Sequence, residues 1–309
     1  MPHTLSIGTR GSPLALAQSH MVAAALAMAS KGKVSDFPLS IIRTTGDVTQ
    51  DRALAAIGGK GLFTKEIDAA QLEGSIDIAV HSAKDLPTAL PDGLIVAGYL
   101  PREDVRDAFI GHNGTRLKDL RKGAVVGTVS LRRQALLKRL RPDLTIIVFR
   151  GNIDTRLTKV VRGEVDGTLL AVAGMKRLGL DAKATELLDP VEFPPAVGQA
   201  AIAIVTRCDD AATNALVGQI THRETGIALD AERAFLAALD GSCRMPIAAY
   251  GTVNGTDVQL KGMVLSADGT ESHEISGSAP IADAAALGRR LGTTLRARLG
   301  EAFLAALKV

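Results

Sequence analysis

The feature that most constrains the fold of this chain is a repeated alternation of short apolar runs with helical patterns. Within the first hundred residues, the apolar runs include TLSIGTR, LSIIRTTG, IDIAVHS and LIVAGYL. Between them lie stretches with helical character, among them SPLALAQSHMVAAALAMA and LFTKEIDAAQLEG. The alternation returns further along in AVVGTV, LTIIVFR and GTLLAV. This β-α-β pattern predicts mostly parallel sheets with helices packed on their faces.

Local signals fix several helix ends. Ser12 precedes Pro13, which predicts an N-cap followed by the first helical position. Asn152 is in the same way the expected N-cap of a later helix, and Gly74 is expected to end the helix before it. Each of these positions lies beside an apolar run, as expected for elements of an α/β fold.

Changes in pattern divide the chain. A hinge-like LPREDVRD ends the first α/β unit, the proline-rich DPVEFPPAVGQ returns from the second, and AAIAIVTR is a strand that could rejoin the first. After a helix in GIALDAERAFLAAL, three strands and a closing helix from Ile281 follow. We predict an α/β protein of three domains. They are residues 1–100 with 200–220, residues 101–199, and a small α+β domain over 221–309 with a three-stranded antiparallel sheet.

Composition argues against several classes of protein. The net charge is only +3, aromatic residues make up 3% and Trp is absent, so we expect no nucleic-acid partner. No apolar run approaches the roughly 18 residues of a membrane helix, and the N-terminus lacks a secretory pattern. Two cysteines form no disulfide framework, and six histidines show no metal-ligand spacing. The chain is expected to be cytoplasmic, with no metal and no membrane partner.

Arginine, rather than lysine, supplies most of the positive charge, with 23 of the 36 basic residues. Several arginines fall where predicted strands give way to helices, namely Arg10, Arg132, Arg133, Arg150 and Arg156. In open parallel sheets, ligands bind beyond the carboxyl ends of the strands, where helix N-termini also attract anions. The arginines therefore predict a polyanion-binding cleft between two α/β units. The ordinary alternative is that they are solvated surface residues.

The segment AVHSAKDLPT places Ser82, Lys84 and Asp85 at the end of a predicted strand. Neighbouring cations would keep Asp85 ionised, and an ionised carboxylate can stabilise a developing cation or take a proton. An ordinary capped turn before Pro87 explains this segment equally well.

Two further loops are candidates for function. IGGKGLFTKEID lacks the Gly-Lys-Ser/Thr of a phosphate-binding loop and is interpreted as a lid that brings Phe63 near the cleft. DGSCRMPIAAYG places Cys243 in a turn beside Arg244, which favours a thiolate. A free cysteine is more often a small buried filler, but a turn makes burial less expected.

Eight segments, in order from residue 5 to about residue 251, resemble the porphobilinogen deaminase (hydroxymethylbilane synthase) family. They are IGTRGSPLALAQ, GGKGLFTKEID, DIAVHSAKDLPT, VGTVSLRRQALL, FRGNIDTRL, AVAGMKRLGL, PAVGQAA and DGSCRMPIAAYG. The resemblance implies two lobes like those of periplasmic binding proteins and a third, smaller domain. It also implies a cytoplasmic monomer that acts on porphobilinogen and a growing oligopyrrole.

The resemblance implies a transferase of tetrapyrrole and heme biosynthesis. Such an enzyme deaminates four porphobilinogen molecules and joins them head to tail into the linear tetrapyrrole hydroxymethylbilane. A dipyrromethane primer would be attached to Cys243 through a thioether, and the acetate and propionate groups of each pyrrole would explain the arginines.

The resemblance also implies a role for each matching residue. Asp85 would be the catalytic aspartate that stabilises the cation left when ammonia departs. The cofactor-binding residues would be Cys243, Ser82, Lys84, Asp85, Thr128, Ser130, Arg132 and Arg133. The substrate path would be lined by Arg10, Ser12, Phe63, Arg150, Arg156, Arg177 and Gln199. Three positions depart from the residues frequent in the family, which has glycine at each: Ser242, Ala200 and Ala248.

Two other functions compete with this one. A non-catalytic solute-binding protein would share the two-lobed architecture, but it would carry an export signal and need neither Cys243 nor Asp85. A cysteine-nucleophile transferase would need a histidine base near Cys243, and the sequence places none there.

Overall fold

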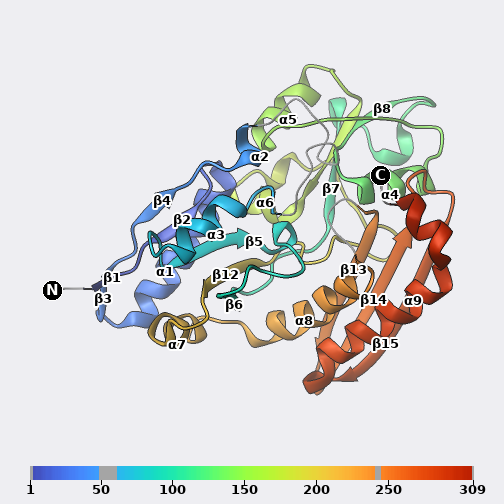
Figure 1. Cartoon of the computed structure of the whole chain (residues 1–309). Coiled ribbons are helices and arrows are strands. Elements are labelled where there is room, and N and C mark those ends of the chain that lie inside the picture. The colour runs from blue at the N-terminus through green and yellow to red at the C-terminus, as the bar shows by residue number, and fades with distance from the viewer. Residues whose placement is uncertain (1–2, 49–60, 241–244, 308–309) are drawn as a thin grey trace. The chain divides into compact units, whose positions relative to one another are not determined.

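The structure is a computed structural model that describes residues 3–48, 61–240 and 245–307 (Figure 1). Cys243 and Ser242 lie outside the described residues. The chain divides into two compact units. Unit 1 contains the described residues of Met1–Gln50, Gly59–Glu103 and Ala200–Gly226, and unit 2 those of Asp104–Gln199 and Ile227–Val309. The finer division into three domains stays a prediction.

Unit 1 is built on a five-stranded sheet with the order β4-β2-β5-β12-β6. Its strands are β2 (Ile7–Thr9), β4 (Leu39–Ile41), β5 (Ile78–Ser82), β6 (Leu94–Tyr99) and β12 (Ile202–Arg207). β4, β2 and β5 are parallel, whereas β12 runs antiparallel to both β5 and β6. β12 is the segment AAIAIVTR, so the prediction that this strand rejoins the first unit is confirmed.

The remaining elements of unit 1 surround this sheet. A short parallel pair joins β1 (His3–Thr4) to β3 (Val34–Asp36). The helices are α1 (Pro13–Ser30), α2 (Thr45–Val48), α3 (Lys65–Leu72) and α7 (Ala211–Gly218), with a 3-10 turn η2 at Ala83–Asp85. Apolar residues of the sheet, among them Ile7 and Val80, share a buried cluster with Val22 and Leu26 of α1. The side chains on the other face of β5, such as that of His81, are therefore directed away from α1.

Helix α1 begins as the sequence predicts, because the Ser12 hydroxyl accepts a hydrogen bond from the Ala15 N–H at 3.3 Å. Its 18 residues have a mean hydropathy of 1.2, so by length and composition it could cross a membrane. The sequence-based statement that no apolar run approaches this length is therefore wrong. One such helix is weak evidence for a membrane span, since core helices of globular proteins pass the same test, and α1 packs here on β2 and β5.

Unit 2 contains a second five-stranded sheet, with the order β11-β7-β10-β8-β9. Its strands are β7 (Asp107–Gly111), β8 (Val125–Gly127), β9 (Thr145–Ile147), β10 (Gly167–Ala171) and β11 (Glu186–Leu187). β9, β8 and β10 are parallel, and β7 is antiparallel to β10 and β11. The two sheets thus share a pattern of strand directions, with three parallel strands followed by one antiparallel strand. The antiparallel strand is the last of its sheet in the sequence of unit 1 (β12) and the first in that of unit 2 (β7).

The helices and turns of this part of unit 2 follow its strands. They are α4 (Leu131–Leu140), α5 (Ile153–Val161), α6 (Val172–Arg177), and the 3-10 turns η3 (His112–Gly114), η4 (Leu117–Asp119) and η5 (Asp181–Lys183). Asn152 caps α5, because its side chain accepts the Thr155 N–H at 2.8 Å. The predicted N-cap at Asn152 is confirmed.

The C-terminal part of unit 2 is a three-stranded antiparallel sheet, as predicted. Its strands are β13 (Ile247–Asn254), β14 (Asp257–Leu265) and β15 (Ser272–Pro280). The accompanying helices are α8 (Arg223–Ala238) and α9 (Ala284–Leu307), with a 3-10 turn η6 at Ile281–Asp283. Phe235 of α8 and Leu291 of α9 share a buried core with Leu260 of β14.

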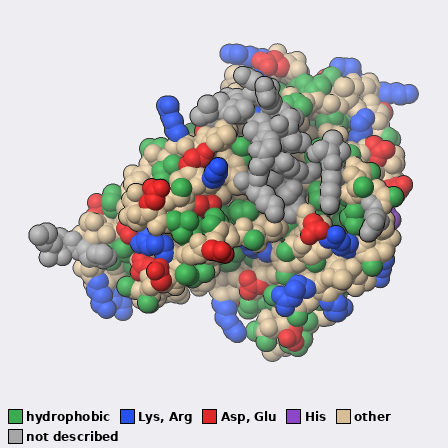
Figure 2. All heavy atoms as spheres, in the orientation of Figure 1, with side chains coloured by type: hydrophobic (Ala, Val, Ile, Leu, Met, Phe, Trp, Pro, Cys, Tyr) green, Lys and Arg blue, Asp and Glu red, His purple; other side chains and the backbone are tan. Residues whose placement is uncertain are grey.

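The visible surface carries charges of both signs. On the face shown in Figure 2, basic and acidic side chains lie interspersed among apolar ones. This mixture agrees with the net charge of only +3 over the chain. It is not the broad basic face that nucleic-acid binding typically needs.

Candidate active site

In unit 1, the predicted site residues follow two neighbouring parallel strands. Arg10 comes directly after β2, and Ser82 is the last residue of β5. The chain then turns through η2, which contains Lys84 and Asp85. Because β2 and β5 are adjacent and parallel, their carboxyl ends meet at one edge of the sheet. The structure therefore brings these residues to the edge where α/β proteins bind ligands.

Asp85 stands out at this edge. Its carboxylate is half-buried, yet it makes no hydrogen bond or ion pair with any described residue. Ser82, by contrast, contacts the Gln18 amide, with 2.9 Å between Oγ and Nε2. The oxygens of Asp85 are not among the buried side-chain atoms that lack a partner, so they can be reached from outside the protein. Asp85 is thus the carboxylate at this edge that is available to a ligand.

Arg10 is held by two neighbours that lie far from it in sequence. Its Nε donates to Asp47 Oδ1 at 3.1 Å, and its guanidinium lies 4.2 Å from the centre of the Phe63 ring. Partial burial alone would raise the pKa of Asp47, but hydrogen bonds from Arg10 and Thr44 lower it below its ordinary value. The structure brings Arg10 and Phe63 into contact. It shows in addition a carboxylate, Asp47, that sequence reasoning did not identify.

His81 shows that this edge of unit 1 is poorly hydrated. The residue is 5% exposed, and its Nε2 has no hydrogen-bond partner among the described residues. Burial lowers the pKa of His81 to about 4, and the positive charge of Arg10 acts in the same direction. The imidazole is therefore neutral at neutral pH, so it adds no positive charge to that of Arg10 and Lys84.

In unit 2, the predicted residues follow three neighbouring parallel strands. Thr128 and Ser130 connect β8 to α4, Arg150 follows β9, and Arg177 ends the helix after β10. The Ser130 side chain caps α4 by accepting the Arg133 N–H at 3.4 Å, and Thr128 Oγ1 accepts the Ser130 N–H at 3.2 Å. The hydroxyls predicted to bind a cofactor therefore also order the N-terminus of α4.

Arg132 and Arg133 are buried and converge on one carboxylate. Arg132 Nη2 donates to Asp107 Oδ2 at 2.6 Å, and Arg133 Nη2 donates to Asp107 Oδ1 at 2.7 Å. The side chain of Asp107 is 0% exposed. Burial alone would raise the pKa of Asp107, but the two guanidinium groups lower it far below its ordinary value. Sequence reasoning missed Asp107, which opens a strand inside what was taken for a hinge.

Gln199 belongs to the same cluster. Its side chain is almost fully buried, and Nε2 donates to the Val105 carbonyl at 2.7 Å and to Asp107 Oδ1 at 3.1 Å. The position predicted to line the substrate path is thus joined to the carboxylate that holds both arginines.

Arg156 has a different environment. Its Nε donates to the Gly151 carbonyl at 3.0 Å, and it has no carboxylate partner among the described residues. Burial lowers the pKa of Arg156 to about 10, and the positive charge of nearby Arg133 acts in the same direction. Two cations near each other without enough anions favour binding of an anion from outside.

The residues of unit 2 fit a cofactor that carries carboxylates. Arg132 Nε and Arg133 Nε are buried donors without an acceptor among the described residues. A buried, unpaired donor is unusual in a native protein, and an arginine edge is suited to a carboxylate. The acidic side groups of a dipyrromethane match these donors in charge. Arg132 and Arg133 could therefore hold its carboxylates, while Cys243, which the resemblance implies as its attachment point, lies outside the described residues.

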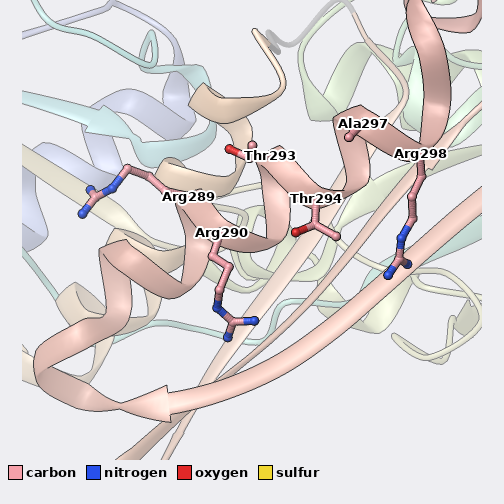
Figure 3. A pocket seen from close by; sticks show the side chains of 6 residues that line it. All are labelled: Arg289, Arg290, Thr293, Thr294, Ala297 and Arg298. Carbon is pink, nitrogen blue, oxygen red and sulfur yellow. The ribbon is translucent and has the colours of Figure 1, made fainter.

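Another group of arginines in unit 2 is exposed to solvent and not buried. A shallow depression on α9 is lined by Arg289, Arg290 and Arg298 together with Thr293, Thr294 and Ala297. Figure 3 shows that the three arginine side chains extend in different directions from the helix. All three are exposed, so they are solvated surface residues of the kind that the sequence left open as an alternative.

Two solved structures that resemble this chain are distant from it. A lipoprotein of the YaeC family from Enterococcus faecalis has a TM-score of 0.44 and 13% identity, over 72% of this chain and 93% of that one. The periplasmic aliphatic sulphonate binding protein of Escherichia coli has a TM-score of 0.43 and 16% identity, over 78% and 71%. Scores this low carry no argument about fold or function.

Sequence comparisons are much closer. The family described as "Porphobilinogen deaminase, dipyromethane cofactor binding domain" matches residues 5–215, and "Porphobilinogen deaminase, C-terminal domain" matches residues 227–297. Porphobilinogen deaminases from Nitrobacter hamburgensis and Nitrobacter winogradskyi are each 55% identical over 298 residues, which is 96% of this chain and 94% of each relative. With two matching domains and this identity over nearly its whole length, the chain belongs to the porphobilinogen deaminase family.

Proposed function

We propose that this chain deaminates porphobilinogen and joins four such units head to tail into hydroxymethylbilane, on a dipyrromethane attached to Cys243. The observation that carries the proposal is Asp85, a half-buried carboxylate with no partner among the described residues. It lies at the carboxyl edge of a sheet, next to a strand that presents Arg10. Membership of the porphobilinogen deaminase family supports the reaction and the cofactor.

In this proposal, the acidic residue acts on the developing positive charge, and the basic residues bind the carboxylates of the substrate and cofactor. The bound cofactor would supply the free pyrrole carbon to which the first unit is joined, and each later unit would be joined to the unit before it. Asp85 accepts hydrogen bonds from pyrrole N–H groups and stabilises the positive charge that develops as the carbon–nitrogen bond breaks and ammonia leaves. The cations bind the acetate and propionate groups: Arg10 in unit 1, and Arg150, Arg156 and Arg177 in unit 2. Arg132 and Arg133 hold the carboxylates of the cofactor.

Other proposed contributions are less direct. Ser82, Lys84, Thr128 and Ser130 would bind the cofactor, while Ser12, Phe63 and Gln199 would line the path of the substrate. We also propose that the enzyme is a cytoplasmic monomer. The solute-binding alternative has no use for a reactive carboxylate at the position of Asp85.

The test replaces Asp85 by its neutral isostere. Asp85→Asn keeps the shape of the side chain but removes the charge that stabilises the departing cation, so turnover should fall by about 10²- to 10³-fold. Intact mass should still show the two-pyrrole addition, and Cys243→Ser should remove it. Asp92→Asn is the matched control, because Asp92 is an exposed aspartate of the same unit. A wild-type rate in Asp85→Asn would contradict the role, and a wild-type chain of unmodified mass would contradict the covalent cofactor.

A further inference from the structure

One buried carboxylate of unit 2 has no part in the proposed reaction. Asp107, the first residue of β7, is fully buried and accepts hydrogen bonds from Arg132, Arg133 and Gln199. A charge in this position is costly to bury. Replacing an ion cluster with apolar side chains often stabilises a protein, so stability alone is a weak reason to have it.

The hydrogen bonds fix each arginine from two sides. Arg132 Nη1 donates to the Pro194 carbonyl at 2.6 Å, and Arg133 Nη1 donates to the Leu169 carbonyl at 2.9 Å. With Nη2 of both bound to Asp107, each guanidinium is anchored through both terminal nitrogens. The Nε donors are left buried and without an acceptor among the described residues. The terminal nitrogens of both arginines are therefore bound within the protein, and only the Nε donors remain to bind a ligand.

We infer that Asp107 is the positioning residue of the cofactor site, which orients Arg132 and Arg133 so that their Nε donors meet cofactor carboxylates. Asp107 touches neither substrate nor cofactor and acts through the arginines. Its bond to Gln199 extends this control. Gln199 is the last residue of the segment Asp104–Gln199, and Asp107 lies close to the start of the same segment. The orientation of both arginines is thereby linked to both ends of this segment. This inference rests on the proposed function.

The experiment follows cofactor assembly rather than turnover. The full-length chain is purified from cells that make no porphobilinogen, porphobilinogen is added, and the gain of two pyrrole units is followed by intact mass spectrometry. Asp107→Asn removes the charge that holds both guanidinium groups, so we expect assembly to slow by about tenfold or more. The matched control is Asp143→Asn, which breaks the ion pair of Asp143 with Arg141 on the surface of the same unit.

Stability is measured alongside by circular dichroism and thermal unfolding, with assembly followed only on the folded fraction. A purely structural role would lower the melting temperature and leave the assembly rate of folded protein unchanged. That result would overturn the inference. If Asp107→Asn yields no folded protein, Asp107→Glu decides, because it keeps the charge but displaces the carboxylate oxygens. We expect it to slow assembly at least severalfold, and a wild-type rate would overturn the inference.

The outcome separates this inference from the proposed function. If wild-type protein gains two pyrrole units and Asp107→Asn gains them equally fast, the proposed function stands and the role of Asp107 fails. If wild-type protein gains no mass, the covalent cofactor itself is wrong.

Discussion

The two five-stranded sheets share a pattern of strand directions, but the charged side chains at their carboxyl edges are arranged in opposite ways. At the edge of unit 1, the carboxylate of Asp85 has no partner among the described residues, while Arg10 is paired with Asp47. At the edge of unit 2, the carboxylate of Asp107 is paired with two arginines, whose Nε donors have no acceptor in the described part of the chain. One pattern of strand directions thus supports two complementary sites. The chemistry depends on the few side chains at the edge and not on the sheet itself.

The first and largest prediction tests whether water is excluded from His81 at the edge of unit 1. The folded-state pKa of His81 is about 4 and its ordinary value is 6.5, so between these values the unfolded chain binds a proton that the folded chain does not. Stability should therefore fall as the pH falls from 6.5 to 4, by about 3 kcal/mol from this group.

The measurement is urea unfolding at pH 7 and at pH 4. His81→Asn should lose about 3 kcal/mol less stability than wild type between the two, whereas the exposed control His20→Asn should behave as wild type. Equal losses in wild type and His81→Asn would show that the edge is hydrated.

A second experiment sharpens the comparison at the edge of unit 2. Arg156 has no carboxylate partner among the described residues, so Arg156→Leu removes a charge-assisted bond to the substrate and little from the fold. Such a bond contributes about 1.5–3 kcal/mol, which corresponds to a rise in KM for porphobilinogen of about 10- to 100-fold. Arg162→Leu is the control, because Arg162 is exposed just beyond the same helix. An unchanged KM in Arg156→Leu would place Arg156 among the solvated arginines.

The smallest expected effect is a change in the free energy of unfolding at Ala200, the residue where the chain returns to unit 1. Ala200 has a φ of +75°, a backbone conformation that favours glycine. Ala200→Gly should stabilise the protein by about 0.5–1 kcal/mol in urea unfolding. Ala201→Gly, at a neighbouring buried alanine without this strain, should destabilise it by a similar amount. Loss of stability in Ala200→Gly would mean that the strain is compensated locally.

Elements with local signals could be predicted from the sequence. Ser12 and Asn152 were identified as N-caps because capping depends on residues only three positions apart. The arginines at strand–helix junctions were found because parallel strands end at a common edge. β7 was missed, since its five residues follow the charged segment PREDVR and carry no turn signal of their own.

The carboxylate partners could not be predicted in the same way. Asp47 lies 37 residues from Arg10, and Asp107 lies 25 and 26 residues from Arg132 and Arg133. Nothing in the spacing marks such pairs, because they are set by the order of strands in the sheet and not by local sequence. Cys243, which the sequence singled out, lies outside the described residues, so its role rests on family membership.

The strand order also bears on how the protein is made. β12 lies between β5 and β6 in the sheet of unit 1, although about a hundred residues of unit 2 are synthesised before it. When the ribosome has synthesised the chain up to residue 199, every strand of the second sheet is present. In the first sheet, β5 and β6 still lack the strand β12 that pairs with both, so each has an unpaired edge. We expect ribosome-bound intermediates to gain protease resistance over residues 104–199 before they gain it over residues 61–103. During that interval, the first unit is the part most in need of a chaperone.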